Sequence, residues 1–382
     1  MDDVPPGPTG PGPRRPALSI VIPVHNGEND LECCLRRLRE SRGSDFEIIV
    51  VDDASTDNSA AIAVRFGARV IATPNTVARG PASARNDGAR EARSALVFFL
   101  DADVALHPDA LTKALARFDA DPGLTALFGS YDDEPASPGL VSRFRNLLHH
   151  FTHQQGRFEA NVRPARTFWT GCGAIRREAF LEAGGFDPRL YNRPAIEDIE
   201  LGYRLTRSGH RIVLARDVLG THLKHWTISN VIKTDVFQRG VPWMLLIKRS
   251  GVAESDLNVR PGQKLCVAAT GLAVIALPAA LWTPEVLFFA ALAPLVILIL
   301  NLPFYRFLAK KRGVAFAAAS LPFHLLYFAC CGISVILALS YWHLVLRRKR
   351  SASNSQGPMG IGRKRTTAGR DMGWFSTRRR TR

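Results

Sequence analysis

The sequence has few of the features that mark secreted, disulfide-stabilised proteins. Its six cysteines include no C-x-x-C pair and no framework spacing, and several lie in apolar segments, so we read them as reduced thiols. Residues 1–16 are rich in proline and glycine and contain no apolar run, which argues against a signal peptide there. We therefore expect a disordered leader over 1–16, followed by a cytoplasmic catalytic domain.

Acidic residues are scarce at the other end of the sequence. From residue 347 to residue 382 the only acid is Asp371, against twelve arginines and lysines, and this segment supplies most of the formal net charge of +16. A basic run of this kind binds anionic lipid or nucleic acid, or is simply solvated. We predict a basic, disordered tail over 347–382. The remaining chain is long and apolar enough to bury a full core and to contain more than one unit.

Strand and helix patterns alternate over the first hundred residues. Apolar runs with β-branched and aromatic members predict strands at 18–24, 46–51, 69–72 and 96–100. Helical patterns with polar starts separate them. This alternation predicts βαβ units, and hence an α/β fold with a mainly parallel sheet.

Carboxylates follow two of these predicted strands. Asp101 and Asp103 come directly after 96–100, and Asp52 and Asp53 end the strand at 46–51. Ligands of open α/β sheets bind beyond the carboxyl ends of the strands, and paired carboxylates suit a hard divalent cation. In the alternative interpretation these residues only turn the chain or cap the following helices.

Four segments, taken in order, resemble the nucleotide-sugar-binding half of the family 2 glycosyltransferases, which have the GT-A fold. They read VIPVHN, VVDDASTD, ARGPASARNDGA and FFLDAD. The resemblance implies that Asp101 and Asp103 hold Mg²⁺ or Mn²⁺ on the diphosphate of a UDP- or GDP-sugar. The residues expected at the donor nucleotide are Asp52, Asp53, Arg79, Arg85, Asn86 and Lys224. From the residues alone, Arg79 and Arg85 mark either an anion site at a helix start or an ordinary solvated start.

The acceptor side is expected in the second half of this domain. Residues 168–177 read as a strand interrupted by Gly171 and Gly173, which allow close backbone approach to a ligand. The run from 170 to 187 resembles the family segment that lines the sugar pocket, although a bulged strand and a glycine-capped helix would also explain the glycines. The residues expected in this pocket are Trp169, Gly171, Cys172 and Gly173.

An amphipathic helix pattern at 196–205 carries Glu197 and Asp198 in its first turn, where the helix dipole favours anions. Inverting sugar transfer needs a carboxylate general base. By the resemblance Asp198 is the candidate base, with Glu197 second. His222 is either a third metal or diphosphate contact or a structural histidine, and Lys224 could neutralise the leaving diphosphate.

The last third of the chain has the character of a membrane anchor. Residues 231–249 mix apolar and cationic side chains like an interfacial helix, and they lack the Q-x-x-R-W motif of processive members, which favours single-sugar transfer. Two nearly uncharged stretches, 265–282 and 286–304, predict a spanning hairpin. A third, 314–346, is long for one span and short for two. If it crosses once, the basic tail ends opposite the catalytic domain, against the positive-inside rule.

We therefore predict a GT-A domain at 17–225, an interfacial segment at 226–264 and a membrane region at 265–346. The expected function is a membrane-bound, inverting, metal-dependent glycosyltransferase acting on a lipid or lipid-linked saccharide, with no specific nucleic-acid partner. The alternatives are a nucleotidyltransferase, which would release pyrophosphate, and a basic membrane protein that binds nucleic acid.

Overall fold

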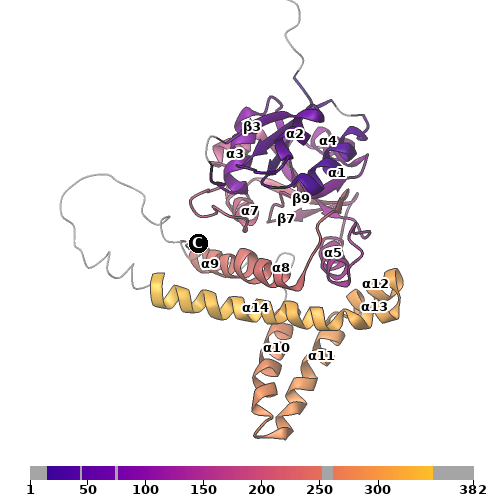
Figure 1. Ribbon diagram of the computed structural model, residues 1–382, viewed down its shortest axis with the longest axis vertical. Coiled ribbons are helices and arrows are strands. Elements are labelled where there is room, and N and C mark those ends of the chain that lie inside the picture. Colours follow the sequence, from indigo (N-terminus) through magenta and orange to yellow (C-terminus); the bar gives the residue numbers. More distant parts are fainter. Residues whose placement is uncertain (1–14, 44, 74–75, 252–260, 347–382) are drawn as a thin grey trace, which may run out of the picture.

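The computed structural model describes residues 15–43, 45–73, 76–251 and 261–346 (Figure 1). All but the end of the predicted leader, and the whole of the predicted tail, lie outside the described residues. A mixed sheet forms the centre of the N-terminal part, with strand order β3-β2-β1-β4-β8-β6-β9-β5 and with β7 paired to β9. The strands are β1 (Leu18–Val24), β2 (Phe46–Asp52), β3 (Arg69–Ala72), β4 (Leu96–Leu100), β5 (Val104–Leu106), β6 (Leu124–Tyr131), β7 (Val162–Ala165), β8 (Cys172–Arg176) and β9 (Arg211–His222).

Strands β3, β2, β1 and β4 run parallel, as the alternating pattern predicts. Beyond them β8 runs antiparallel between β4 and β6, and β6 is again parallel to β9. The carboxyl ends of β1, β2, β4, β6 and β9 therefore meet at one edge of the sheet. This is the edge at which ligands of such sheets bind.

Helices cover both faces of the sheet, which explains why its strands are apolar at nearly every position. Alternate residues of β4 point to opposite sides, so that Phe98 packs with one core and Phe99 with the other. One face is covered by α1 (Glu28–Arg39), α2 (Ser59–Arg65) and α4 (Ala110–Ala120). The opposite face is covered by α3 (Pro81–Glu91), α6 (Arg177–Glu182) and α7 (Glu197–Arg207).

The remaining helices form a layer beneath the sheet and a protruding hairpin (Figure 1). The layer contains α5 (Leu140–His153), α8 (Ile228–Ile232), the π-helical segment η1 (Lys233–Gly240), α9 (Val241–Ser250), α12 (Leu302–Arg312), α13 (Val314–Ala319), α14 (Leu321–Tyr341) and the π-helical end η3 (Trp342–Leu346). The hairpin is α10 (Pro261–Ala279), the 3-10 turn η2 (Pro284–Val286) and α11 (Leu287–Leu300).

The helix after β1 begins at Glu28, and the residue before it, Gly27, has no side chain to cap the first turn. One expectation about the membrane region needed correction. The second apolar stretch does not continue straight to residue 304, because the chain bends by 75° between α11 and α12. Two helices of the described chain are long and apolar enough to cross a membrane, and the bent pair could be a third.

Candidate active site

Asp53 lies at the end of β2 and holds a neighbouring loop. Both of its carboxylate oxygens accept backbone N–H groups, from Arg79 at 2.9 Å and Gly80 at 2.7 Å. Asp52 accepts the N–H of Ser55 at 3.0 Å, which is the turn chemistry of the alternative interpretation. Between them and the next helix, Ala54 has a left-handed φ of 60°, a conformation that clusters at functional sites. The two carboxylates thus shape this corner, and their contact with a nucleotide stays a prediction.

Arg85 joins two carboxylates from distant parts of the chain. Its guanidinium donates to Asp101 Oδ1 at 2.6 Å and to Glu197 Oε1 at 2.8 Å. The arginine is buried, and so is Glu197, which also accepts the N–H of Ala195 at 3.0 Å. Arg85 was expected at the donor nucleotide, but its charge is taken up by these carboxylates. It positions the carboxylate after β4 against the start of α7.

Arg79 offers a natural comparison, because it lies in the same segment and was expected to have the same role. Its guanidinium pairs with Asp87 on α3, and its side chain is 32% exposed, against 6% for Arg85. An exposed pair contributes about 0–1 kcal/mol to stability, whereas removing one partner of a buried pair costs about 3–5 kcal/mol.

We therefore expect Arg85→Gln to lower the free energy of unfolding by about 3–5 kcal/mol, because Glu197 is left buried without its counter-charge. Arg79→Gln should cost no more than about 1 kcal/mol. Thermal unfolding of both variants in detergent, compared with the parent chain, measures the difference. Equal melting temperatures for the two variants would contradict a bridging role for Arg85.

Asp103 faces two cationic or polar partners. Its Oδ2 lies 3.7 Å from His222 Nε2 and 3.8 Å from Lys224 Nζ. Burial alone would raise the pKa of Asp103, but His222 and Lys224 outweigh it and lower the pKa to about 2. The side chains of Asp101 and Asp103 remain 32% and 24% exposed. Both can therefore present oxygen to a ligand at this edge.

The sequence also suggested His222 as a third metal ligand. His222 is buried, its Nδ1 lies 3.1 Å from Asn146 Oδ1, and its ring stacks on Tyr131 with centroids 4.1 Å apart. Within the described ranges, no three His, Cys, Asp or Glu side chains converge as a metal cage. Two carboxylates nevertheless suit Mg²⁺ or Mn²⁺, which take the rest of their ligands from water and substrate phosphates.

Asp198 lies beside the Arg85 bridge but is not part of it. Its Oδ2 accepts the N–H of Thr170 at 3.2 Å, and its Oδ1 accepts the N–H of Ile199 at 2.8 Å. Burial and the negative charge of Glu197 raise the pKa of Asp198 to about 6, although Arg85 opposes this. A carboxylate with a pKa near the working pH is suited to take a proton in catalysis.

Three of the four residues predicted to line the sugar pocket, Gly171, Cys172 and Gly173, pack against other parts of the fold, and the fourth is Trp169. Cys172 has no exposed surface and lies in the sheet core, so its thiol cannot reach a ligand. A Cβ on Gly171 would lie 2.4 Å from the indole of Trp169, and a Cβ on Gly173 would lie 2.3 Å from the Trp169 carbonyl oxygen. The two glycines therefore make room for Trp169, and their contact with a sugar stays a prediction. Trp169 itself remains half-buried at the site edge.

Asn86 also differs from expectation. Its Nδ2 donates to the Phe186 carbonyl at 2.8 Å, and its Oδ1 accepts the Phe186 N–H at 2.9 Å. The side chain is buried, and both the nitrogen and the oxygen of its amide are engaged in this contact. Asn86 therefore fixes the loop before α7, and its expected contact with a nucleotide stays a prediction.

An aromatic group next to Asp103 was missed in the sequence. Tyr131 ends β6, and its ring lies 4.8 Å from Trp169 and 4.4 Å from His149, which comes from α5. Burial holds the pKa of His149 well below its ordinary value, so this imidazole is neutral. The signal was available, because Tyr131 is followed by two aspartates at a strand end like Asp52 and Asp101.

Comparison with known proteins agrees with this geometry. Residues 19–184 match the profile of Glycosyl transferase family 2. An uncharacterized protein of Mycobacterium tuberculosis is 31% identical over 206 residues, covering 50% of this chain and 63% of that protein. Validoxylamine A glucosyltransferase of Streptomyces hygroscopicus subsp. limoneus is 30% identical over 237 residues, covering 55% and 52%. The chain thus spans less than two thirds of each of these relatives.

One solved structure shares the fold over most of both chains. It is a mannosyltransferase from Pyrobaculum calidifontis in complex with GDP-Man and Mn²⁺. The TM-score is 0.53 at 20% identity, and the match covers 87% of this chain and 90% of that one. At this identity the likeness shows a common fold.

Proposed function

We propose that this chain, which has the GT-A fold and whose residues 19–184 match glycosyl transferase family 2, transfers one sugar from a nucleotide-diphosphate donor with inversion. The donor is a UDP- or GDP-sugar bound at the carboxyl ends of β1, β2 and β4. The acceptor is a lipid or lipid-linked saccharide. Asp198 is the general base, and Asp101 with Asp103 is the metal motif.

The Arg85 bridge is the observation that carries this proposal. It holds Asp101, in the proposed metal motif, and Glu197, next to the proposed base, on one guanidinium. A displacement at the anomeric carbon needs the leaving diphosphate and the base at opposite ends of one reacting centre. Because the buried Arg85 guanidinium contacts both Asp101 and Glu197, it fixes the distance between the proposed metal motif and the turn that carries the proposed base.

In the proposed reaction the acceptor hydroxyl oxygen attacks the anomeric carbon and forms the new glycosidic bond. The bond between that carbon and the diphosphate oxygen breaks, and the nucleoside diphosphate leaves with the electron pair. Asp198 takes the hydroxyl proton. Lys224, 43% exposed beside Asp103, is placed to offset the charge of the departing diphosphate.

Asp101 and Asp103 would hold the divalent cation through their exposed oxygens. When bound, such a cation neutralises charge on the diphosphate. The Pyrobaculum mannosyltransferase was solved with GDP-Man and Mn²⁺, which supports the proposal that this chain binds a nucleotide sugar together with a divalent metal ion. Trp169, half-buried at the same edge, offers apolar ring surface to a sugar, and the buried ring of Tyr131 packs against it.

A panel of nucleotide sugars, tested on the detergent-solubilised full chain with and without Mn²⁺, checks the proposal. We expect metal-dependent release of nucleoside diphosphate from one UDP- or GDP-sugar, and faster release when a polyprenyl-phosphate or glycolipid acceptor is added. Release of pyrophosphate from a nucleoside triphosphate would instead indicate the alternative, a nucleotidyltransferase.

A further inference from the structure

The apolar stretch 314–345 meets the length and hydropathy requirements of a membrane span. Whether it crosses decides on which side of the membrane the chain continues past residue 346. Its main helix, α14, lies across the direction of the α10–α11 hairpin, between the hairpin and the helices α5, α8 and α9 (Figure 1). The residues that α14 contacts at its two ends and in its middle indicate whether it lies on the side of the catalytic domain.

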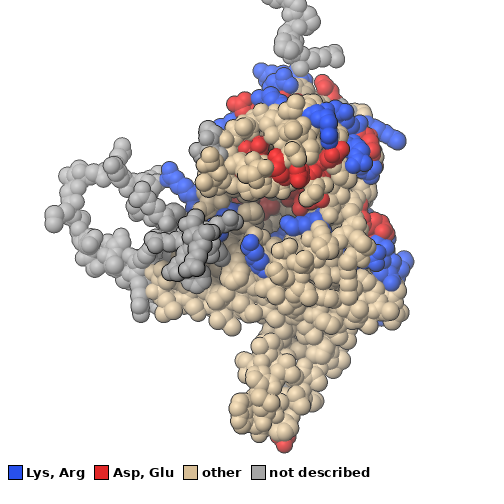
Figure 2. All heavy atoms as spheres, viewed as in Figure 1, with Lys and Arg blue, Asp and Glu red and all other residues tan. Residues whose placement is uncertain are grey.

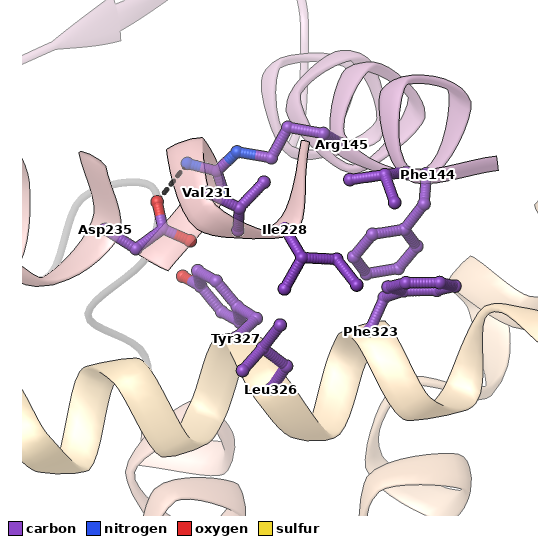
Figure 3. A pocket seen from close by; sticks show the side chains of 9 residues that line it. Phe144, Arg145, Ile228, Val231, Asp235, Phe323, Leu326 and Tyr327 are labelled. Carbon is purple, nitrogen blue, oxygen red and sulfur yellow. Dashed lines mark hydrogen bonds and ion pairs between the residues drawn. The ribbon is translucent and has the colours of Figure 1, made fainter. Parts of the chain in front are cut away.

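The first turns of α14 pack against the catalytic domain. Phe323, Leu326 and Tyr327 point toward Phe144 of α5 and toward α8 and η1, and together they line a small cavity (Figure 3). The ring centroids of Phe144 and Phe323 lie 6.0 Å apart. Arg145 of α5 and Asp235 of η1, which form a buried ion pair, also line this cavity.

The middle and the end of α14 pack against the same layer. Gly240, between η1 and α9, has no side chain, and a Cβ there would lie 2.1 Å from Ser334 Oγ, so the two helices touch at this point. Near the C-terminal end, Ala338 and Tyr341 form a cluster with Leu245 of α9. The beginning, middle and end of α14 thus all contact elements on the catalytic side.

The α10–α11 hairpin, by contrast, extends away from the sheet. Between residues 265 and 305 the only charged side chain is Glu285, and an acidic group stands at the far end of the hairpin (Figure 2). The 19 residues of α10 rise about 28 Å, close to the ~30 Å of a bilayer's hydrocarbon core. The exposed apolar side chains of the hairpin include Leu272, Val274 and Ile275 on α10 and Phe288, Leu295 and Ile299 on α11.

The hairpin also begins and ends on one side. At the bend after α11, Asn301 accepts from Gln263 Nε2 at 3.1 Å and donates to the Ile297 carbonyl at 3.0 Å, which links the two stems. Past the bend, Lys311 pairs with Asp133 and Arg312 with Glu134, both from the loop after β6. These ion pairs return the chain to the catalytic domain before α14 begins.

We propose that, among the helices that the structure describes, only α10 and α11 cross the bilayer, and that α14 lies in the plane of the membrane interface beneath α5, η1 and α9. The side of the membrane on which the chain continues past residue 346 is then the catalytic side. This removes the conflict with the positive-inside rule, because the cations of α12 and those after residue 347 share one side. Anionic head groups are the partner that these cations favour.

Three variants of the full chain test this topology, and each carries the same epitope tag at one of three positions. The positions are before Met1, after Trp282 at the hairpin tip, where the side chain is 81% exposed, and after Arg382. Each tagged chain also carries a second, different tag before Met1. Sealed proteoliposomes of phosphatidylcholine and phosphatidylglycerol are captured through that second tag, so that the catalytic side faces outward, and are then probed with antibody before and after detergent.

We expect the first and last tags to react fully in sealed vesicles and the tip tag to react only after detergent. A last tag that behaves like the tip tag would show that α14 crosses, and a tip tag open in sealed vesicles would show that the hairpin does not cross. Either result overturns the proposal. If the insertion at the tip prevents folding, Leu281→Cys, at a position 79% exposed, gives the same readout with a membrane-impermeant maleimide relative to the parent chain.

Discussion

Asp198→Asn is expected to lower the single-turnover rate of sugar transfer roughly 10²- to 10⁴-fold while donor affinity stays unchanged. The proposed proton transfer from the acceptor is made in the transition state, so its loss should not weaken donor binding. Asparagine keeps the shape of the side chain and can still accept the Thr170 N–H. Rapid-quench transfer assays with titration of donor binding measure both quantities.

The pH dependence of transfer makes this test sharper. The pKa of Asp198 is about 6, raised by burial and by the charge of Glu197, so the base is protonated and inactive below that pH. The rate should rise with pH through about 6 and then level off, and Asp198→Asn should remove this rise. Glu197→Gln is the matched control, which should retain the rise but shift it to lower pH. Wild-type rates in Asp198→Asn, or rate and donor affinity falling together, would contradict the assignment.

Asp103→Asn is expected to abolish most transfer and the Mn²⁺-dependent part of donor binding, while the fold persists because the side chain lies partly exposed at a strand end. A neutral amide is a poorer ligand for a hard cation than a carboxylate. Calorimetric titration of the donor with and without Mn²⁺ gives the metal-dependent part directly.

Asp109→Asn is a suitable control for this experiment. Asp109 follows β5 in the same region, is 58% exposed and pairs only with Lys113 among the described contacts. Its loss should leave both transfer and metal-dependent binding intact. Donor binding in Asp103→Asn that responds to Mn²⁺ as in the parent chain would place the metal elsewhere.

The positions of the carboxylates at the strand ends could be predicted from the sequence, because the apolar pattern and the geometry of parallel sheets lead to the same edge. Apolar runs fix the strands, and parallel strands bring their carboxyl ends together, so Asp53, Asp101 and Asp103 were expected at one edge and lie there. Which atoms each carboxylate contacts could not be predicted. Asp53 binds backbone N–H groups and Asp101 binds Arg85, because the loop at 79–80 and helix α3 arrive from elsewhere in the fold.

Other features could not be predicted because a sequence pattern shows which residues are apolar but not which neighbours they pack against. The pattern at 314–346 is apolar all round, which fits a crossing helix and a helix packed between two layers equally well. Only contacts such as Gly240 with Ser334 distinguish the two. In the same way, Gly171 and Gly173 indicated a close approach, but the approaching group is Trp169.

Helix α5 lies between β6 and β7 in the sequence, yet its apolar face packs against residues from more than 150 positions later in the chain. Phe144 and Leu147 share a core with Phe304, Leu308 and Phe328. During synthesis, the sheet can therefore assemble while this face of α5 still lacks its partners. That apolar face of α5 therefore stays exposed in the newly made chain until α12 and α14 have been synthesised and pack over it.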